Sequence, residues 1–395
     1  MKTPRKNNSN SLCVGFDAKR AVSNATGLGN YSRYAISSML AAFPQLKAVL
    51  YSPKADKDAR LKDIIESPNV SLRTYSGHMG AAGRALWRSF GVTSGFADDN
   101  IDLYHGLSNE LPLNIASAGI PSVLTMHDII YRRFPDDYRS WDRTIYDFKY
   151  SRSAEGASRI IAVSQRTKDD IVNDYNIDPA KIDVVYQGIH PIFRGRVGTG
   201  QKAEARARYS LPEKYIISVG TVSPRKNQML AVAALAQMPD DIKLVIVGGE
   251  KRDYADRIAR KAAALHVTDR IIRLKDVPLY DLPALYAGAS ASIYPSRYEG
   301  FGLPVVEALA CGTPVVACTG SCLEEAGGRG AVYVDPDDVD AAADALTKMS
   351  TEVIYHDKYA RAGLKHIADF NDAEFAKKTM AVYRKAILSE IMDYE

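Results

Sequence analysis

The sequence has no long apolar segment of the kind that crosses a membrane. Its 395 residues contain no run of about 18 apolar residues, the length that a transmembrane helix requires. The start of the chain, Met1 to Ser11, is polar and basic, and the apolar run at 12–17 is too short for the core of a signal peptide. We therefore expect a protein of the cytoplasm.

Cysteine is scarce, with four residues in the whole chain. Cys311, Cys318 and Cys322 lie close together in the sequence, but their spacing matches no common zinc motif. Cys311 and Cys318 flank an apolar segment, where small buried thiols are common, and Cys13 lies alone near the start. We expect neither a metal site nor a disulfide.

A strong charge of one sign is also absent. The chain has 51 Lys and Arg against 47 Asp and Glu, a formal net charge of +4. Because nucleic-acid-binding domains usually carry a far more basic face, we expect no nucleic-acid partner. Hydrophobic residues at 46% and charged residues at 25% are typical of a globular protein, and 395 residues predict two or three domains of about 150 residues each.

Short β-rich runs alternate with longer amphipathic runs along most of the chain, which predicts βαβ units and parallel sheets. A segment poor in strand signals, residues 188–210, divides the runs into two series, and we expect it to contain a short helix, Lys202–Tyr209. The expected strands are 12–17, 48–52, 70–74, 101–105, 122–126, 159–163 and 182–186 in the first series, and 215–220, 243–247, 271–274, 291–294, 313–317 and 331–334 in the second.

The two series predict an α/β fold of two Rossmann-like, doubly wound domains. We place an N-terminal domain at residues 1–190 and a C-terminal domain at 191–372. Residues 373–395 should form a helix that packs back on a domain, which we take to be the N-terminal one. Because open α/β sheets bind ligands beyond the carboxyl ends of their strands, we expect the two domains to face each other across a cleft.

A glycine-containing segment, Thr26–Tyr31, follows the first expected strand and precedes an expected helix. Gly27 and Gly29 allow close backbone approach, and a helix N-terminus favours an anion such as a diphosphate. The dinucleotide-binding pattern would need a third glycine where this chain has Ser32. Two interpretations therefore stand: a phosphate loop, or a tight turn between strand and helix.

The segment Pro295–Ala310 carries the strongest signal of a site. Gly300 and Gly302 come before a predicted helix, so backbone N–H groups at the helix start would hold a diphosphate. Glu299 and Glu307 would not favour a phosphate, but carboxylates accept hydrogen bonds from ribose and hexose hydroxyls. A sugar joined to a nucleotide by a diphosphate satisfies both requirements. The alternative is that both glutamates are surface charges near a helix N-terminus.

Polar side chains follow expected strands in both domains. Arg225 and Lys226 lie in the turn after the first strand of the second series, where they would neutralise a leaving diphosphate. Adjacent Arg-Lys pairs are usually plain solvated surface, which is the alternative. His127 ends an expected strand of the first series and would point into the cleft, although a single histidine is more often structural.

Together these motifs resemble the retaining nucleotide-sugar glycosyltransferases of GT-B architecture, in the large family 4 group. The resemblance covers nearly the whole chain and rests first on the Glu-x7-Glu pattern, present as Glu299 and Glu307. The other motifs in the family's order are the Gly27-Leu-Gly29 loop, His127-Asp128, Ala162-Val-Ser164 before a helix, and Gly220-Thr-x4-Lys-Asn.

The resemblance implies a role for each of these residues toward the donor. Arg225 and Lys226 would grip its diphosphate, and Glu299 and His127 would contact the transferred sugar, so these four are implied to be catalytic. Glu307 would accept hydrogen bonds from the ribose. The other residues implied to bind the donor, several of them through the backbone, are Gly27, Gly29, Val277, Leu282, Gly300, Phe301, Gly302 and Leu303.

The resemblance also implies hexose transfer with retention of the anomeric configuration and without a metal ion or cofactor. No obvious Asp-x-Asp motif occupies a cleft position and no nucleophile for a double displacement stands out, so we expect a front-face route. One departure is Leu323, where the family often has proline. It leaves the shape of that loop open and leaves either Glu324 or Glu325 as its acidic residue.

The first guess for the donor is GDP-mannose, because the short His-Asp version of the family resembles mannosyltransferases of bacterial surface polysaccharides; a UDP-hexose is the alternative. The acceptor, a glycan or a lipid-linked saccharide, would bind the first domain. Segments 73–88 and 131–150, rich in arginine and aromatics, would contact this acceptor or anionic lipid at the inner membrane surface, unless they form an ordinary loop and helix. An epimerase or phosphorylase-like enzyme and a non-catalytic carbohydrate-binding relative are the competing functions.

Overall fold

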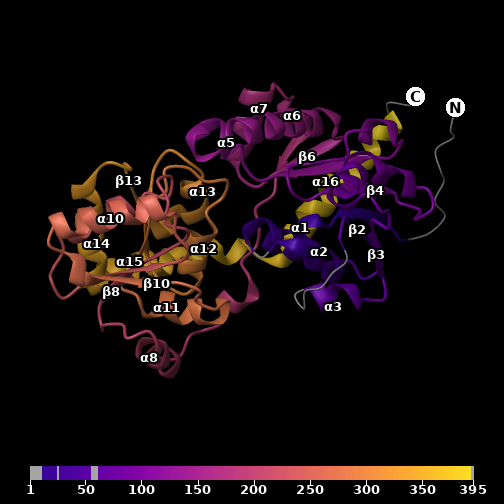
Figure 1. Ribbon diagram of the computed structural model, residues 1–395. Helices are drawn as coiled ribbons and strands as arrows, with labels where there is room; N and C mark the ends of the chain where they lie inside the picture. The colour runs from indigo at the N-terminus through magenta and orange to yellow at the C-terminus, as the bar shows by residue number, and fades with distance from the viewer. Residues whose placement is uncertain (1–10, 25, 55–60, 393–395) are drawn as a thin grey trace. The chain divides into compact units, whose positions relative to one another are not determined.

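The computed structural model describes residues 11–24, 26–54 and 61–392 (Figure 1). The chain forms two compact units, one of Met1–Gly188 with Asn371–Glu395 and one of Ile189–Phe370. Each unit is built on a parallel sheet, which confirms the expected α/β class with two doubly wound domains. Among the described residues, no helix combines the length and the apolar character needed to cross a bilayer.

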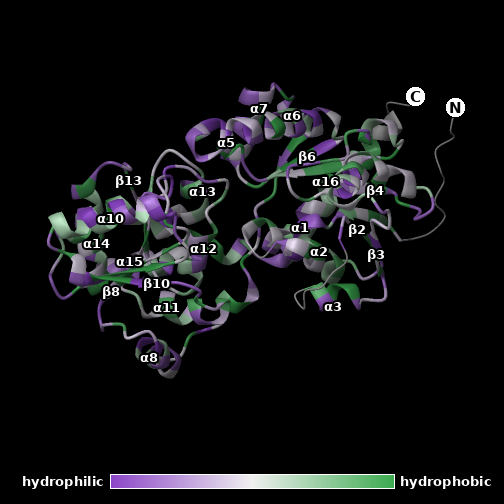
Figure 2. Ribbon diagram, viewed as in Figure 1, coloured by the Kyte–Doolittle hydropathy of each residue, from purple (hydrophilic) through white to green (hydrophobic). Residues whose placement is uncertain are grey.

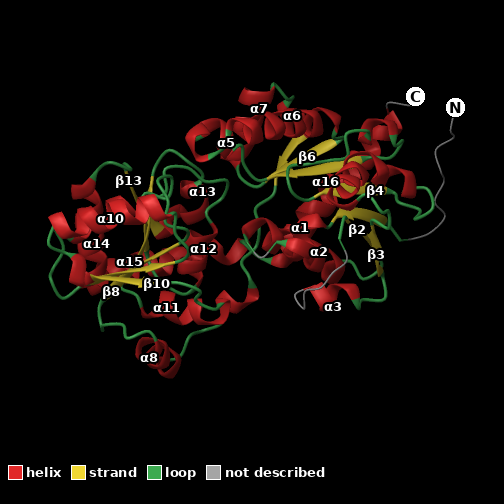
Figure 3. Cartoon of the chain, in the orientation of Figure 1, coloured by secondary structure: helices red, strands yellow, loops and turns green. Residues whose placement is uncertain are grey.

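The sheet of the first unit has seven parallel strands in the order β3-β2-β1-β4-β5-β6-β7. Its central strands are buried along their length because helices cover both faces (Figure 3). The strand order reverses between β1 and β4, the position where open α/β sheets bind ligands. The strands are β1 (Cys13–Asp17), β2 (Lys47–Ser52), β3 (Val70–Thr74), β4 (Leu103–Gly106), β5 (Ser122–Met126), β6 (Arg159–Ala162) and β7 (Ile182–Val184).

The first unit also contains the C-terminal helix of the chain. This helix, α16 (Asp372–Met392), packs against α2 (Gly27–Ala42), and Tyr383 Oη lies 2.7 Å from Nδ1 of the buried His105 in β4. Other helices and short helical turns (η) of this unit are α1 (Lys19–Ser23), α3 (Lys62–Ile65), α4 (Gly80–Leu86), η2 (Trp87–Gly91), η3 (Val92–Gly95), η4 (Ile115–Ser117), α5 (Ile130–Arg133), η5 (Pro135–Asp137), α6 (Ser140–Gly156), α7 (Gln165–Tyr175) and η6 (Pro179–Lys181).

The glycine segment near the start of the chain is helical, so the expectation of a loop at this point is wrong. The short helix α1 follows β1, and Gly27 already begins α2. A Cβ atom on Gly29 would fall 1.8 Å from the carbonyl oxygen of Asn24. Glycine at position 29 therefore lets the start of α2 pack against the end of α1.

The second unit repeats the plan with six parallel strands in the order β10-β9-β8-β11-β12-β13. Hydrophobic residues predominate in the central strands of both units, and the helices around them have mixed hydropathy (Figure 2). β12 begins two residues later than expected because Pro314 has no N–H for the ladder. The strands are β8 (Tyr215–Val219), β9 (Lys243–Val247), β10 (Ile271–Leu274), β11 (Ala291–Tyr294), β12 (Val315–Cys318) and β13 (Ala331–Val334).

Helices surround this second sheet, and their apolar faces form its core. The helix expected at 202–209 begins earlier, at Thr199, where Gln201 Oε1 accepts a hydrogen bond from the N–H of Gly198 at 2.9 Å. The helices and turns are η7 (Pro191–Phe193), α8 (Thr199–Arg208), α9 (Gln228–Leu235), α10 (Arg252–Ala264), η8 (Thr268–Arg270), η9 (Leu279–Asp281), α11 (Leu282–Gly288), α12 (Leu303–Ala310), α13 (Leu323–Gly327), η10 (Gly328–Gly330), α14 (Val339–Thr351), α15 (Val353–His366) and η11 (Ile367–Asp369).

Candidate active site

The loop between β11 and α12 holds Glu299 at the carboxyl edge of the second sheet. Gly302 ends this loop with a φ of +102°, which favours glycine, and a Cβ there would fall 2.6 Å from Leu323 Cδ2. α12 begins at Leu303, so the predicted helix is confirmed, with Pro304 as its second residue, where a missing N–H breaks no intrahelical hydrogen bond. The N-terminus of α12 thus lies beside Glu299.

The carboxylate of Glu299 is held by three donors on one oxygen. Its Oε1 accepts hydrogen bonds from Arg225 Nη1 at 2.8 Å, Lys226 Nζ at 2.5 Å and Ser296 Oγ at 2.5 Å. The side chain is 10% exposed. Burial alone would raise the pKa of Glu299, but the charges of Lys226 and Arg225 outweigh it, so the net pKa is lowered and the group is ionised at neutral pH.

Arg225 and Lys226 reach Glu299 from the turn between β8 and α9. This turn lies next to the Glu299 loop because β8 and β11 are neighbours in the sheet. Arg225 Nη1 also donates to the carbonyl of Tyr298 at 2.6 Å, and Lys226 Nζ donates to the hydroxyl of Tyr294. Burial lowers the pKa of Lys226, and Glu299 opposes that effect. The structure thus brings together three residues that the sequence predicted for one site.

Glu307 lies on α12, and no cation is among its hydrogen-bond partners within the described residues. The side chain is half-buried, and Tyr286 of α11 donates to its Oε2 at 3.5 Å. Burial raises the pKa of Glu307 to about 7. Its carboxyl group therefore titrates near neutral pH, unlike that of Glu299.

The other predicted donor residues of the second unit are distributed along the carboxyl edge of the sheet. Phe301 is buried against Phe370, with ring centroids 5.8 Å apart, so its backbone is fixed beside α12. Val277 follows β10 at the far end of the strand order, and Leu282 begins α11; both are half-buried. Gly300 lies in the same loop as Glu299.

Sequence reasoning missed the residues that support Glu299. Cys322 is fully buried and its Sγ donates to the carbonyl of Glu299 at 3.1 Å, while burial raises the pKa of its thiol. Ser296 donates a hydrogen bond to Glu299, and Tyr294 accepts one from Lys226. The available signal for Tyr294 and Ser296 was their position at the end of the apolar strand β11, where side chains reach the carboxyl edge of the sheet.

His127 follows β5 at the carboxyl edge of the first sheet. Its Nε2 lies 2.9 Å from the carbonyl of Leu107, and its ring meets Tyr31 edge-on at 4.4 Å between centroids. Since a carbonyl only accepts, Nε2 carries the proton and Nδ1 keeps its lone pair. Burial lowers the pKa of His127 to about 4, so the ring is neutral at physiological pH.

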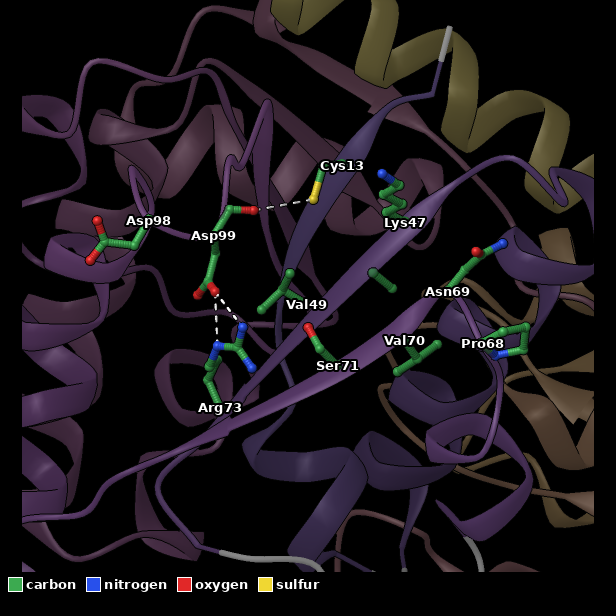
Figure 4. Close-up of a pocket in the computed structure, with 11 residues that line it drawn as sticks. Cys13, Lys47, Val49, Pro68, Asn69, Val70, Ser71, Arg73, Asp98 and Asp99 are labelled. Carbon is green, nitrogen blue, oxygen red and sulfur yellow. Dashed lines mark hydrogen bonds and ion pairs between the residues drawn. The ribbon is translucent and has the colours of Figure 1, made fainter. Parts of the chain in front are cut away.

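The segment 73–88 differs from the free basic surface that its composition suggests. Arg73 Nη2 lies 2.7 Å from Asp99 Oδ1, where both side chains line a hollow against β1, β2 and β3 (Figure 4). Arg88 is largely buried, and its Nη2 donates to Asp17 Oδ2 at 2.6 Å. Two of its three arginines are therefore engaged by carboxylates within the protein.

The segment 131–150 forms α5 and most of α6. Arg132 is paired with Asp147 at 2.5 Å, which again neutralises a cation of the segment. α6 nevertheless exposes two large apolar side chains, Trp141 at 76% and Phe148 at 56%. They lie seven residues apart and therefore on one face of the helix.

Sequence comparison matches both units to known families. Residues 38–192 match the family described as Glycosyltransferase Family 4, and residues 201–366 match Glycosyl transferases group 1. Together these two glycosyltransferase families match most of the chain. These matches confirm the resemblance to the family 4 glycosyltransferases that the Glu-x7-Glu pattern and its companion motifs indicated, while the retention of configuration stays a prediction.

Two curated relatives of this chain carry different names. The O-antigen chain mannosyltransferase RfbU of Salmonella typhimurium is 30% identical over 244 residues, which cover 59% of this chain and 65% of that protein. A D-inositol 3-phosphate glycosyltransferase of Salinispora tropica is 33% identical over 252 residues, which cover 58% of this chain and 52% of that protein. The matched region therefore spans about half to two thirds of these relatives.

A solved structure shows the same fold as this chain. The structure of Anabaena Alr3699/HepE in complex with UDP and glucose superposes with a TM-score of 0.73. The superposition covers 94% of this chain and 99% of that one, at 19% sequence identity. It confirms the GT-B architecture of paired α/β domains.

Proposed function

We propose that this chain is a hexosyltransferase, which moves a hexose from a nucleoside diphosphate sugar to a hydroxyl of a glycan or lipid-linked acceptor. The observation that carries the proposal is the cluster of Arg225, Lys226 and Glu299 beside the start of α12. The cations and the helix N-terminus would bind the diphosphate, and the ionised carboxylate would accept hydrogen bonds from the sugar.

The diphosphate binds between the cations and the helix start in this proposal. Two cations and one carboxylate leave a net charge of +1 in the cluster. Backbone N–H groups at the start of α12 add partial positive charge, which favours a phosphate group. Because these charges are fixed in place before the reaction, they also stabilise the negative charge that develops on the leaving diphosphate.

Glu299 and Glu307 bind hydroxyl groups. Glu299 is ionised and its three donors all engage Oε1, so Oε2 is the oxygen that accepts from the transferred sugar. Glu307 accepts from the ribose, and two hydroxyl donors would favour its ionised form. Val277 and Leu282 would then lie toward the nucleobase, and His127 toward the hexose with its neutral ring.

The proposed transfer keeps the anomeric configuration. The bond between the anomeric carbon and the diphosphate oxygen breaks, and the acceptor oxygen bonds to that carbon on the same face. The acceptor proton passes to the departing phosphate oxygen, so the atoms balance without an enzyme nucleophile. The hydrogen bonds on Glu299 support this route, because a carboxylate that two cations engage is a weak nucleophile.

Arg225 and Lys226 supply by fixed charge what a divalent metal supplies in other transferases, so we propose that the reaction needs neither metal nor cofactor. GDP-mannose is the first candidate donor, supported by the similarity to the Salmonella mannosyltransferase. A UDP-hexose is the second candidate, because the structural neighbour from Anabaena was solved with UDP and glucose. The intact cluster argues against a non-catalytic relative.

A lipid-linked acceptor would bring the protein to a membrane surface. The exposed Trp141 and Phe148 on one face of α6 support a peripheral contact there. The test is sedimentation with anionic vesicles, comparing the wild type with a Trp141→Ser, Phe148→Ser double variant. Equal sedimentation of the two proteins would exclude α6 from the contact.

A donor panel tests the proposed function. The purified protein is incubated with GDP-mannose, UDP-glucose, UDP-galactose and UDP-N-acetylglucosamine in the presence of EDTA, and both slow donor hydrolysis and thermal stabilisation are recorded. We expect one donor to stabilise the protein and to be hydrolysed despite EDTA. Activity that returns only when Mg²⁺ or Mn²⁺ replaces EDTA would contradict metal independence, and no response under either condition would contradict the function.

A further inference from the structure

Five charged side chains gather at the carboxyl edge of the first unit's sheet. Asp17 ends β1 and Lys19 begins α1, while Glu110 follows β4. Arg88 comes from η2 and Lys149 from α6. Four separate segments of the chain thus meet where open α/β sheets bind ligands.

Arg88 links the two carboxylates of this group. Its Nη2 donates to Asp17 Oδ2 at 2.6 Å, and its Nη1 donates to Glu110 Oε2. Lys149 Nζ donates to the same Glu110 oxygen at 3.2 Å. The side chains of Arg88, Asp17 and Glu110 are each 11% exposed or less, so these ion pairs are buried within the protein and do not lie on its surface.

Three polar atoms of the group have no partner within the described part of the chain. Both donors to Glu110 engage Oε2, which leaves Oε1 without a hydrogen bond from any described residue. Lys19 makes its hydrogen bond to Asp17 through the backbone N–H, and its ammonium group donates to no described acceptor. The guanidinium Nε of Arg88 is likewise buried and unpaired.

The charges of the group act on one another. Burial alone would raise the pKa of Glu110, but Arg88, Lys149 and Lys19 lower it to about 2. Burial lowers the pKa of Lys19, and the nearby charge of Arg88 lowers it further. A half-buried ammonium beside an ionised carboxylate therefore offers one donor and one acceptor to an incoming molecule.

We propose that Lys19 and Glu110 bind hydroxyl groups of the acceptor sugar, and that Arg88 and Lys149 position Glu110 for that contact. A sugar hydroxyl both donates and accepts, so adjacent hydroxyls match Glu110 Oε1 and the Lys19 ammonium together. The competing ligand is an anion such as a phosphate, because three cations and two carboxylates leave the group with a net charge of +1. A hydroxyl is favoured over a fully ionised phosphate because it can donate to Glu110 Oε1. This inference rests on the proposed function and names the acceptor subsite of the transferase.

The test uses n-octyl α-mannoside, β-glucoside, β-galactoside and N-acetyl-β-glucosaminide as probes, below their micelle concentrations. Dissociation constants are measured by ligand-observed NMR for the wild type, Lys19→Met and Glu110→Gln. Lys47→Met is the matched control, because Lys47 begins β2 and so lies at the opposite edge of the same sheet. Lys19→Met disrupts no side-chain hydrogen bond of the described protein, so it leaves the fold intact.

We expect at least one glycoside to bind the wild type and Lys47→Met equally, and about tenfold more weakly to each of the other two variants, as the loss of a hydrogen bond to a charged group predicts. Equal binding by all four proteins, or binding by none, would overturn the proposal. Inorganic pyrophosphate that binds the wild type, and whose binding Lys19→Met alone abolishes, would also overturn it by revealing an anion site.

Donor hydrolysis separates this proposal from the one on which it rests. Lys19→Met and Glu110→Gln should hydrolyse the nucleotide sugar at the wild-type rate without acceptor, because neither residue belongs to the donor cluster. If the wild type hydrolyses a donor and the substitutions leave glycoside binding unchanged, only the proposal of the acceptor subsite fails. If no donor is hydrolysed or bound, the proposed function itself fails.

Discussion

Replacement of Glu299 by glutamine isolates the charge of the candidate active site. The amide has nearly the same shape as the carboxylate, so packing is kept while the counter-ion of Arg225 and Lys226 is removed. Both cations now converge on a single oxygen of Glu299, at 2.8 and 2.5 Å. In the variant they face each other without a negative partner.

Two opposite effects are expected from this substitution. Unpaired buried polar groups cost about 1–3 kcal/mol each, and because the two cations retain some solvent access we expect the donor-free variant to lose about 1–2 kcal/mol of its free energy of unfolding. Turnover should fall about 100- to 1,000-fold, as when one preorganised contact to a reacting group is removed. Affinity for GDP or UDP should stay equal or rise, since the diphosphate becomes the counter-ion.

The assay combines donor hydrolysis, urea unfolding and calorimetric titration of GDP and UDP. Glu204→Gln is the matched control, because Glu204 forms an exposed ion pair with Arg208 on α8. The control should resemble the wild type in all three measurements. Turnover of Glu299→Gln within threefold of the wild type, or a marked loss of nucleotide affinity, would refute the reasoning.

Three further predictions follow from the same geometry. The pKa of Glu307 is raised from its ordinary 4.5 to about 7, so its contribution to the stability of the donor-free protein is present below pH 4.5 and is lost as the pH rises through about 7. Urea unfolding measured across this pH range should show the loss of stability in the wild type and not in Glu307→Gln. The same pH dependence in both proteins would contradict the prediction. The pKa of His127 is lowered from 6.5 to about 4, so its contribution to the stability of the protein is present above pH 6.5 and is lost as the pH falls toward 4. NMR at pH 7 should show a neutral ring protonated at Nε2. A titration midpoint of the His127 ring near pH 6.5 would be inconsistent with its burial. Gly302→Ala should lose about 1–2 kcal/mol of stability through its left-handed backbone alone, and more through contact with Leu323, so unchanged urea unfolding would argue against the loop described here.

The sheets were predictable because their strands are continuous apolar runs between amphipathic helices. Segments such as Lys243–Val247 and Ala291–Tyr294 were predicted with their observed bounds. The glycine segment at 26–31 was not, because the short helix α1 gives little periodic signal over five residues. Its Gly29 serves contact between helices, which has no signature in sequence spacing.

The candidate site was predictable in its residues and not in its contacts. Glycines, glutamates and a cation pair at strand ends indicated Glu299, Arg225 and Lys226 from sequence alone. That Arg225 and Lys226 share one oxygen of Glu299 depends on two loops more than 70 residues apart, which only the adjacency of β8 and β11 brings together. The burial of Arg88 was equally hidden, since its partner Asp17 lies 71 residues away.

In the proposed function, Arg225 and Lys226 hold the diphosphate of a nucleotide sugar. The most direct measurement is calorimetric titration of GDP and UDP, with EDTA present, into the wild type and into Arg225→Gln and Lys226→Gln. We expect the wild type to bind one nucleotide and each variant to lose at least about tenfold in affinity, the effect of one charge-assisted hydrogen bond. Wild-type affinity in both variants would contradict it.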